Sequence, residues 1–321
     1  MTAPAKNACR FASVWVAIFV LSVVFIAPTW ADAPCDDVWL INTRCLPHGD
    51  SLDTTLQGLD YQRRDPLQGW SPSDARTFRQ QTSKSVPTII FVHGNWTDAC
   101  EAVEKADAAY AAIRAQVGDR PFRFVIWSWP ADRVYHRIRD DLYLKADYCD
   151  AESYYLARWL DTQIEPGAPI SLIGHSFGPR IIAGALHLLG GGPIDDRTLT
   201  SQTVSAWSGG RRNPIRLVLM AAALGDNGLA PDAVYGRALK LVDRALVTCN
   251  PCDRVLRWYP RVADHSCGDQ ALGAIGPQTA ADNVDVIDVR GSVGRQHQCR
   301  RYSQSCELAD QWARYTFLDG R

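Results

Sequence analysis

The chain has 321 residues, of which 46% are hydrophobic and 21% charged, and this balance is typical of a globular protein with one large core or two modest ones. The 34 basic and 35 acidic side chains leave a formal net charge of -1. There is thus no electrostatic reason to expect a nucleic-acid partner, and the charge weakly favours a small, largely uncharged substrate.

Residues 1–31 have the pattern of an export signal. Lys6 and Arg10 precede an uncharged apolar stretch over residues 11–27, and small residues follow at Thr29 and Ala31. A basic start, an apolar centre and a small-x-small cleavage site mark a secretory signal peptide. We therefore expect cleavage after Ala31 and a secreted or periplasmic protein. In the alternative, the uncleaved segment anchors the chain to a membrane.

Nine of the ten cysteines lie beyond this segment, and in an exported chain this number favours disulfide bonds. The expected local pairs are Cys35 with Cys45 and Cys100 with Cys149. Two more bridges are expected among Cys249, Cys252, Cys267, Cys299 and Cys306. The alternative is a zinc site built from Cys249, Cys252, His265 and Cys267.

The first part of the mature chain is weakly patterned. Residues 32–85 are polar and rich in Asp, Arg, Gly and Pro, so we expect an irregular lead-in with at most a short strand or two. A continuous apolar, β-branched run over residues 88–92 then predicts a strand buried on both faces. Residues 98–116 predict the helix that follows it, ended by Gly118.

The same alternation continues to the end of the chain. Further strands are predicted at residues 122–127, 169–173, 216–220, 245–248 and 284–289, with helices at 151–164 and 180–189. Strands that alternate with helices form a mostly parallel sheet covered by helices on both faces. The sequence therefore predicts one α/β domain over residues 86–321, with its binding crevice at the carboxyl ends of the strands.

The sequence Gly174-His175-Ser176-Phe177-Gly178 lies where a predicted buried strand gives way to a helix. It matches the G-x-S-x-G nucleophile elbow, a strained turn that exposes a serine hydroxyl at a helix N-terminus. The flanking glycines suit a turn in which neighbouring main chain leaves no space for a β-carbon. The pattern predicts Ser176 as a nucleophile, against the plain alternative of an ordinary Gly/Ser turn.

From about residue 87 onward, the chain resembles the α/β-hydrolase superfamily, and within it a group of poorly characterised bacterial members. Residues 91–95 are similar to the oxyanion strand and loop of that family, Ser128-Trp129-Pro130 with Asp140-Asp141 to the segment after the next strand, and residues 174–178 to the elbow. The resemblance implies the α/β-hydrolase fold and the chain order nucleophile, acid, histidine.

An acyl-transfer site needs two main-chain donors that point at one oxygen atom. The elbow is expected to supply the N–H of Phe177, and the loop after the strand 88–92 that of Asn95, with Trp96 as second choice. His93 is expected to be structural. The aromatic side chains of Trp96, Trp127, Trp129 and Trp207 are candidates either for the lining of an apolar pocket or for the core.

Three histidines follow Ser176 and are candidates for the general base. His187 falls inside the helix after the elbow, and His265 lies in an irregular loop before the last strand. His297 lies eight residues beyond the last predicted strand, in a loop at the carboxyl end of the sheet. We therefore predict His297 as the base.

Two aspartates are candidates for the acid. Asp253 follows the strand 245–248 and opens a helical pattern, which resembles the family arrangement of an acid after the penultimate strand. Asp226 lies beside Gly225, Asn227 and Gly228, as in a plain turn. Asp253 is predicted to orient the histidine, with Asp226 as second choice.

These residues together predict an exported serine hydrolase, carboxylesterase-like or lipase-like, that acts on a small acyl substrate. Ser176 would attack an ester carbonyl, His297 would carry the proton, and no cofactor would be needed. The alternative from a different class is a non-catalytic exported binding protein that keeps the hydrolase scaffold. Convergence of the three side chains within hydrogen-bonding distance would favour the enzyme.

Overall fold

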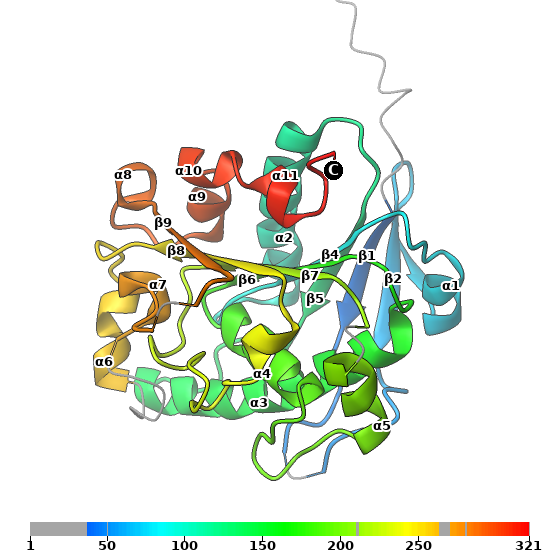
Figure 1. The fold of residues 1–321 in the computed structure, drawn as a ribbon, viewed down its shortest axis with the longest axis horizontal. Helices are drawn as coiled ribbons and strands as arrows, with labels where there is room; N and C mark the ends of the chain where they lie inside the picture. Colours follow the sequence, from blue (N-terminus) through cyan, green and yellow to red (C-terminus); the bar gives the residue numbers. More distant parts are fainter. Residues whose placement is uncertain (1–36, 50, 210–211, 263–269, 280, 321) are drawn as a thin grey trace, which may run out of the picture. The chain divides into compact units, whose positions relative to one another are not determined.

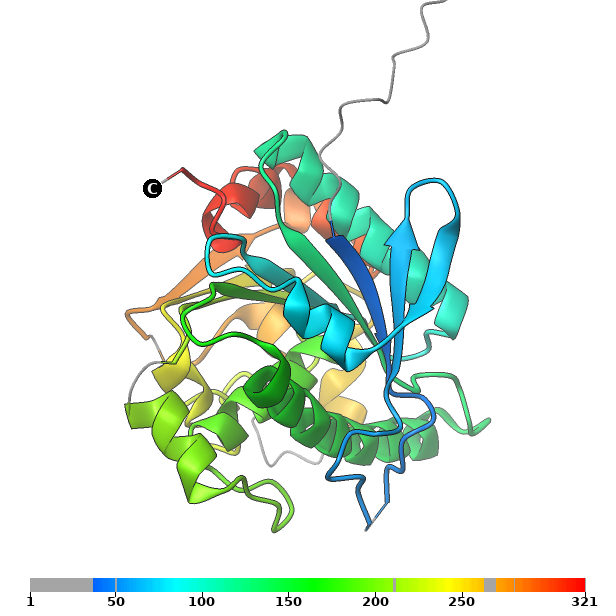
Figure 2. The ribbon, with the colours of Figure 1, turned by 90° about the vertical axis from the view of Figure 1, so that its right-hand side faces the viewer.

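The computed structural model describes residues 37–49, 51–209, 212–262, 270–279 and 281–320, in which one twisted sheet has the order β3-β2-β1-β5-β4-β6-β7-β8-β9 (Figures 1 and 2). The strands are β1 (Asp37–Asn42), β2 (Asp60–Asp65), β3 (Gly69–Ser73), β4 (Thr88–Val92), β5 (Arg123–Ser128), β6 (Ile170–His175), β7 (Ile215–Met220), β8 (Arg244–Cys249) and β9 (Val284–Asp288). In the order of the sheet, all neighbours from β1 to β9 are parallel, whereas β2 pairs antiparallel with both β1 and β3.

Helices cover both faces of the sheet (Figure 1). On one side lie α2 (Ala99–Val117), α8 (Arg290–Val293), α9 (Cys299–Ser303), α10 (Cys306–Ala309) and α11 (Trp312–Tyr315). On the other lie α3 (Ile138–Gln163), α4 (Gly178–Leu189) and α5 (Ser201–Val204). The remaining helical segments are α1 (Ala75–Gln80), the π-helical turn η2 (Ser205–Gly209), η3 (Ala238–Leu241), η4 (Leu256–Trp258), α6 (Tyr259–Val262) and α7 (Leu272–Ile275). The predicted α/β-hydrolase fold class, a mostly parallel sheet between two helical layers, is confirmed.

Alternate residues of the central strands divide between two hydrophobic cores. In β4, Ile90 and Val92 pack with α3 and α4, whereas Ile89 and Phe91 pack with α2 and the C-terminal helices. Both sets are fully buried. This explains why the strand is apolar at every position, because each of its faces meets a helical layer.

Two expectations about secondary structure were wrong. The segment 32–85 is not an irregular lead-in, because its described part adds β1, β2 and β3 to the sheet and contributes α1. The helix expected at residues 151–164 begins at Ile138. Its first half buries charged side chains such as Asp141 and Lys145, which interrupt the apolar periodicity by which a helix is recognised.

The expected disulfides are absent from the described residues, in which Cys45, Cys100, Cys149, Cys249, Cys252, Cys299 and Cys306 are all free thiols. Cys100 is exposed at the start of α2, whereas Cys149 is buried in the core beneath α3. The sheet lies between these helices, so the pair cannot form. Of the five cysteines expected to form two more bridges, the four in the described part of the chain are likewise free thiols.

Several predictions fall on residues outside the described part of the chain. These are the export signal at residues 1–31, Cys35, Cys267 and His265, and with the last two the alternative zinc site. Among the described residues, no helix has the length and apolar character needed to cross a bilayer. Export and cleavage remain predictions.

Candidate active site

Ser176 occupies the sharp turn between β6 and α4 in a left-handed conformation, with a φ of 58°. Its main-chain N–H donates to the Met220 carbonyl oxygen (3.0 Å), and its own carbonyl accepts from the N–H of Ala223 (2.9 Å). These bonds anchor the turn to the loop after β7. They hold a non-glycine residue in a conformation that costs roughly 1–3 kcal/mol, as expected of a nucleophile elbow.

The elbow packs directly against the loop that follows β4. A β-carbon at Gly178 would lie 2.2 Å from the carbonyl oxygen of Val92, and one at Gly94 would lie 2.7 Å from Cβ of Ser176. Neither position has space for a side chain, because main chain from two strand ends meets here. The glycines therefore bring the Asn95 loop next to the serine.

The structure brings Ser176, His297 and Asp253 together from three separate loops. His297, between α8 and α9, places Nε2 2.9 Å from Oγ of Ser176, and its Nδ1 lies 2.8 Å from Oδ2 of Asp253. Asp253 lies in the turn after β8 and is fully buried. The three side chains form one continuous chain of hydrogen bonds that can carry a proton from the serine hydroxyl to the imidazole.

Four hydrogen bonds hold the Asp253 carboxylate. Oδ1 accepts from the main-chain N–H groups of Val255 (2.8 Å) and Leu256 (3.2 Å), while Oδ2 accepts from His297 and from the hydroxyl of Tyr302 (2.6 Å). Burial alone would raise the pKa of Asp253, but the bonds from His297, Tyr302 and the main chain outweigh it and hold the pKa below its usual value. The carboxylate is therefore ionised and correctly placed to orient the imidazole.

The other candidate residues lie elsewhere. Asp226 joins two loops, since Oδ2 accepts from the side-chain amide of Gln278 (2.6 Å) and its main chain pairs with Gln270. His187 is buried in α4, where Nδ1 accepts from the main-chain N–H of Arg237 (3.2 Å). Neither contacts Ser176 or His297.

Two residues that the sequence analysis did not select support the site. His175, beside the nucleophile, donates from Nε2 to the main-chain carbonyl of His297 (2.9 Å). Burial and the neighbouring His297 hold the pKa of His175 well below its ordinary value, so its ring is neutral. Tyr302, in α9, contacts Asp253 as described above. The position of His175 within the elbow was its only sequence signal, and Tyr302 had none.

The loop after β4 and the elbow both carry main-chain donors without a main-chain partner in the described part of the chain. Among the described residues, the main-chain N–H groups of Asn95, Trp96 and Phe177 donate to no other main-chain group, and the buried side-chain amide of Asn95 has no partner. His93 is buried and stacks on Trp129, with Nε2 accepting from its main-chain N–H (3.2 Å). Burial lowers the pKa of His93 to about 3, so this neutral ring acts as a support for the loop.

A pocket of about 730 Å³ opens over Ser176 and His297. Its apolar lining includes Trp96, Leu142, Phe177, Val255 and Trp258. Trp127, Trp129 and Trp207 are instead buried in the core. Cys299 also lines the pocket, but burial raises the pKa of its thiol to about 12, so this thiol is protonated and a poor nucleophile.

No protein-family model matches the chain, and no curated protein matches it in sequence. Among solved structures, it is similar to an inhibited esterase B from Lactobacillus rhamnosis, at 13% identity and a TM-score of 0.36 over 90% of this chain and 89% of that one. A truncated carbohydrate esterase from gut microbiota is 13% identical, with a TM-score of 0.35 over 75% of this chain and 89% of that one. A bifunctional GH43-CE protein of Bacteroides eggerthii is 10% identical, with a TM-score of 0.36 over 84% of this chain and 37% of that one. All three likenesses are weak, so the function proposed below rests on the geometry of the site.

Proposed function

We propose that this protein is a serine ester hydrolase, carboxylesterase-like or lipase-like, with Ser176 as its nucleophile. The observation that carries the proposal is the hydrogen-bonded series from Ser176 Oγ through His297 to the buried Asp253 carboxylate. Ser176 and His297 of this series line a pocket whose lining includes several large apolar side chains. A serine, an imidazole and a carboxylate in this order are the machinery of acyl transfer.

In the proposed mechanism, Oγ of Ser176 attacks the ester carbonyl while Nε2 of His297 takes its proton. The Asp253 carboxylate accepts the N–H at Nδ1 and stabilises the imidazolium that forms. The free N–H groups of Asn95 and Phe177 stabilise the negative oxygen of the tetrahedral intermediate. The imidazolium returns the proton to the leaving alcohol, and a water activated by the same imidazole releases the acid.

The test is to treat the purified protein and its Ser176→Ala variant with a fluorophosphonate probe, and to assay p-nitrophenyl esters of several acyl chain lengths in parallel. We expect one labelled serine, and a fall in kcat on the order of 10⁴-fold or more in the variant, because loss of the nucleophile removes the acyl-enzyme route. The control is Ser208→Ala, which removes the exposed hydroxyl of a serine in η2 that donates to the carbonyl of Val204 at the end of α5 (2.7 Å).

A correctly folded protein that neither reacts with the probe nor turns over any ester would contradict the proposal. It would favour the alternative of a binding protein on a hydrolase scaffold. Circular dichroism of both variants establishes that they remain folded, so a loss of labelling is attributable to the missing hydroxyl.

A further inference from the structure

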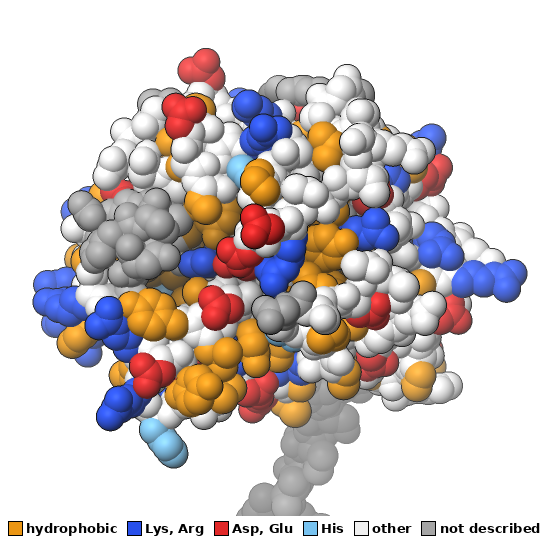
Figure 3. Space-filling view, turned by 90° about the horizontal axis from the view of Figure 1, so that it is seen from below, with side chains coloured by type: hydrophobic (Ala, Val, Ile, Leu, Met, Phe, Trp, Pro, Cys, Tyr) orange, Lys and Arg blue, Asp and Glu red, His pale blue; other side chains and the backbone are white. Residues whose placement is uncertain are grey.

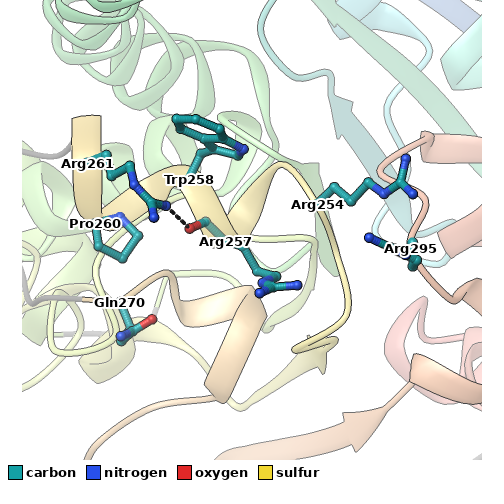
Figure 4. A pocket seen from close by; sticks show the side chains of 7 residues that line it. All are labelled: Arg254, Arg257, Trp258, Pro260, Arg261, Gln270 and Arg295. Atoms are coloured by element: carbon teal, nitrogen blue, oxygen red, sulfur yellow. Dashed lines mark hydrogen bonds between the residues drawn. The ribbon is translucent and has the colours of Figure 1, made fainter.

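A second hollow of about 900 Å³ adjoins the pocket over Ser176. The two share Arg254, Trp258 and Arg261 as lining residues, so they lie side by side. Figure 4 shows that the side chains of the second hollow come from residues 254–261, from Gln270 and from the loop at Arg295. The Arg254 main-chain N–H donates to the Arg295 carbonyl (3.4 Å), which ties the first of these segments to the last.

All charged side chains among the described residues that line these two hollows are basic. They are Lys105, Arg139, Arg254, Arg257, Arg261 and Arg295. The whole chain has a net charge of -1, so this concentration is a local feature. In Figure 3, Lys and Arg side chains mix with Asp and Glu over the middle of the face seen from below, while Lys and Arg gather at its left edge, the side on which α6 lies in Figure 1.

The four arginines of the second hollow form no ion pair with any described carboxylate. Elsewhere in the described chain, arginines pair closely with aspartates, as Arg123 does with Asp37 (2.6 Å) and Arg212 with Asp161 (2.7 Å). In the hollow, Arg261 instead lies over the ring of Trp258, 4.8 Å from its centroid, and donates to the Arg257 carbonyl (3.4 Å). Like charges that form no ion pair within the described part of the chain repel one another, and an anion bound among them would relieve that repulsion.

Two of these arginines lie on the loops that carry residues of the candidate active site. Arg254 directly follows Asp253, and Arg295 lies two residues before His297. An anion held there would lie beside the loops that carry Asp253 and His297. A guanidinium presents a planar pair of donors that matches the two oxygens of a carboxylate or a phosphate.

From these observations we propose that the substrate is an ester that carries an anionic group, a carboxylate or a phosphate, which the arginines of the second hollow bind while the ester lies over Ser176. That the substrate is an ester rests on the proposed function, whereas that it carries an anion rests on the arginines alone. The inference differs from the expectation, based on the net charge of the chain, of a largely uncharged substrate. The arginines would bind the anionic group of such a substrate, and the apolar pocket would bind its apolar part.

The experiment compares two esters with acyl chains of equal length, the p-nitrophenyl monoester of glutarate, which ends in a carboxylate, and p-nitrophenyl pentanoate, which is neutral. We expect kcat/KM to be higher for the acidic ester, with a lower KM. The ratio of the two kcat/KM values should fall about tenfold in Arg257→Gln or Arg295→Gln, as expected for loss of one charge-assisted bond, and also at high salt.

The matched control is Arg76→Gln, which removes one exposed positive charge from α1, on the opposite side of the molecule from α6 in Figure 1. It should leave the ratio unchanged. Competition by succinate and by inorganic phosphate against the neutral ester identifies which anion the hollow prefers. The inference is overturned if the acidic ester is no better than the neutral one, or if the ratio is the same in the wild-type protein and both hollow variants.

The anion site can also be tested if no ester is hydrolysed. Calorimetric titration of the wild-type protein with succinate and with phosphate then measures anion binding directly. Binding that is lost in Arg257→Gln but kept in Arg76→Gln would support the anion site while the proposed function fails. Absence of binding to the wild-type protein would overturn the inference.

Discussion

Tyr302→Phe removes a single hydroxyl from the site, and its effect should depend on pH. The hydroxyl donates to Oδ2 of the buried Asp253 carboxylate (2.6 Å) and also accepts from the side-chain amide of Asn250 (3.2 Å). Asn250 keeps a second partner, the Gly294 carbonyl (2.9 Å). The main loss therefore falls on the carboxylate. A hydrogen bond to a buried charged group contributes about 1.5–3 kcal/mol, so we expect the free energy of unfolding to fall by about 2 kcal/mol at pH 7.

The sign of the pH dependence follows from Asp253. Its pKa in the folded protein is held below the usual value, so its ionisation stabilises the fold above about pH 4, and this contribution is lost as the pH falls through the folded-state pKa. Removal of one donor raises that pKa toward the usual value. The difference in stability between wild type and Tyr302→Phe should thus be full at pH 7 and shrink below pH 4.

The measurement is urea unfolding of both proteins at pH 7 and near pH 3. Tyr61→Phe is the matched control, because the hydroxyl of this buried tyrosine accepts from Nε1 of Trp159 (3.0 Å) and burial raises its pKa to about 12. Neither partner titrates in acid, so the control should cost the same at both pH values. A cost for Tyr302→Phe that does not change between pH 7 and pH 3 would refute this account of Asp253.

Two other substitutions test the geometry of the site. Asp253→Asn should lower kcat by about 10⁴-fold with little change in KM, because the imidazole loses the partner that fixes its tautomer. Asp226→Asn is the control and should leave ester turnover within about threefold of the wild-type value. Equal losses for the two variants in a steady-state assay would show that Asp253 does not orient His297. Gly178→Ala should unfold the elbow or abolish activity, because its β-carbon would lie 2.2 Å from the Val92 carbonyl oxygen. Unchanged thermal stability and turnover of Gly178→Ala would mean that the turn has room the structure does not show.

The sequence predicted well the strands that consist mainly of buried apolar residues. Strands β4 to β8 are short, mostly apolar runs between turn residues, and they and β9 were each found to within about two residues of their bounds. The segment around β2 failed because an outer strand of the sheet is half exposed and reads Asp-Tyr-Gln-Arg-Arg-Asp. Only Tyr61 of this strand is buried, so too few apolar positions remain to distinguish a strand from a polar loop.

Residues of the site that lie in a local motif or directly after a predicted strand were identifiable, whereas the supporting contacts of His175 and Tyr302 were not. The elbow is a local motif, so Ser176 followed from a few neighbouring residues. The disulfides failed for the opposite reason, since spacing along the chain does not reveal that a sheet separates Cys100 from Cys149. A pairing of cysteines depends on distance in space, and the sequence predicts that distance only within one element.

The choice between Asp253 and Asp226 shows what decides the role of a buried carboxylate. Both are almost completely buried, and both lie in loops after strands of the same sheet. Asp226 has its oxygens engaged by Gln270 and Gln278, so it holds two loops together. Asp253 has two main-chain donors on one oxygen, which leaves the other directed at His297 and Tyr302. A carboxylate can orient a histidine only where main-chain donors hold one of its oxygens and the other oxygen remains available for the imidazole. This arrangement depends on the conformation of the whole loop, not on the identity of any single residue in the loop.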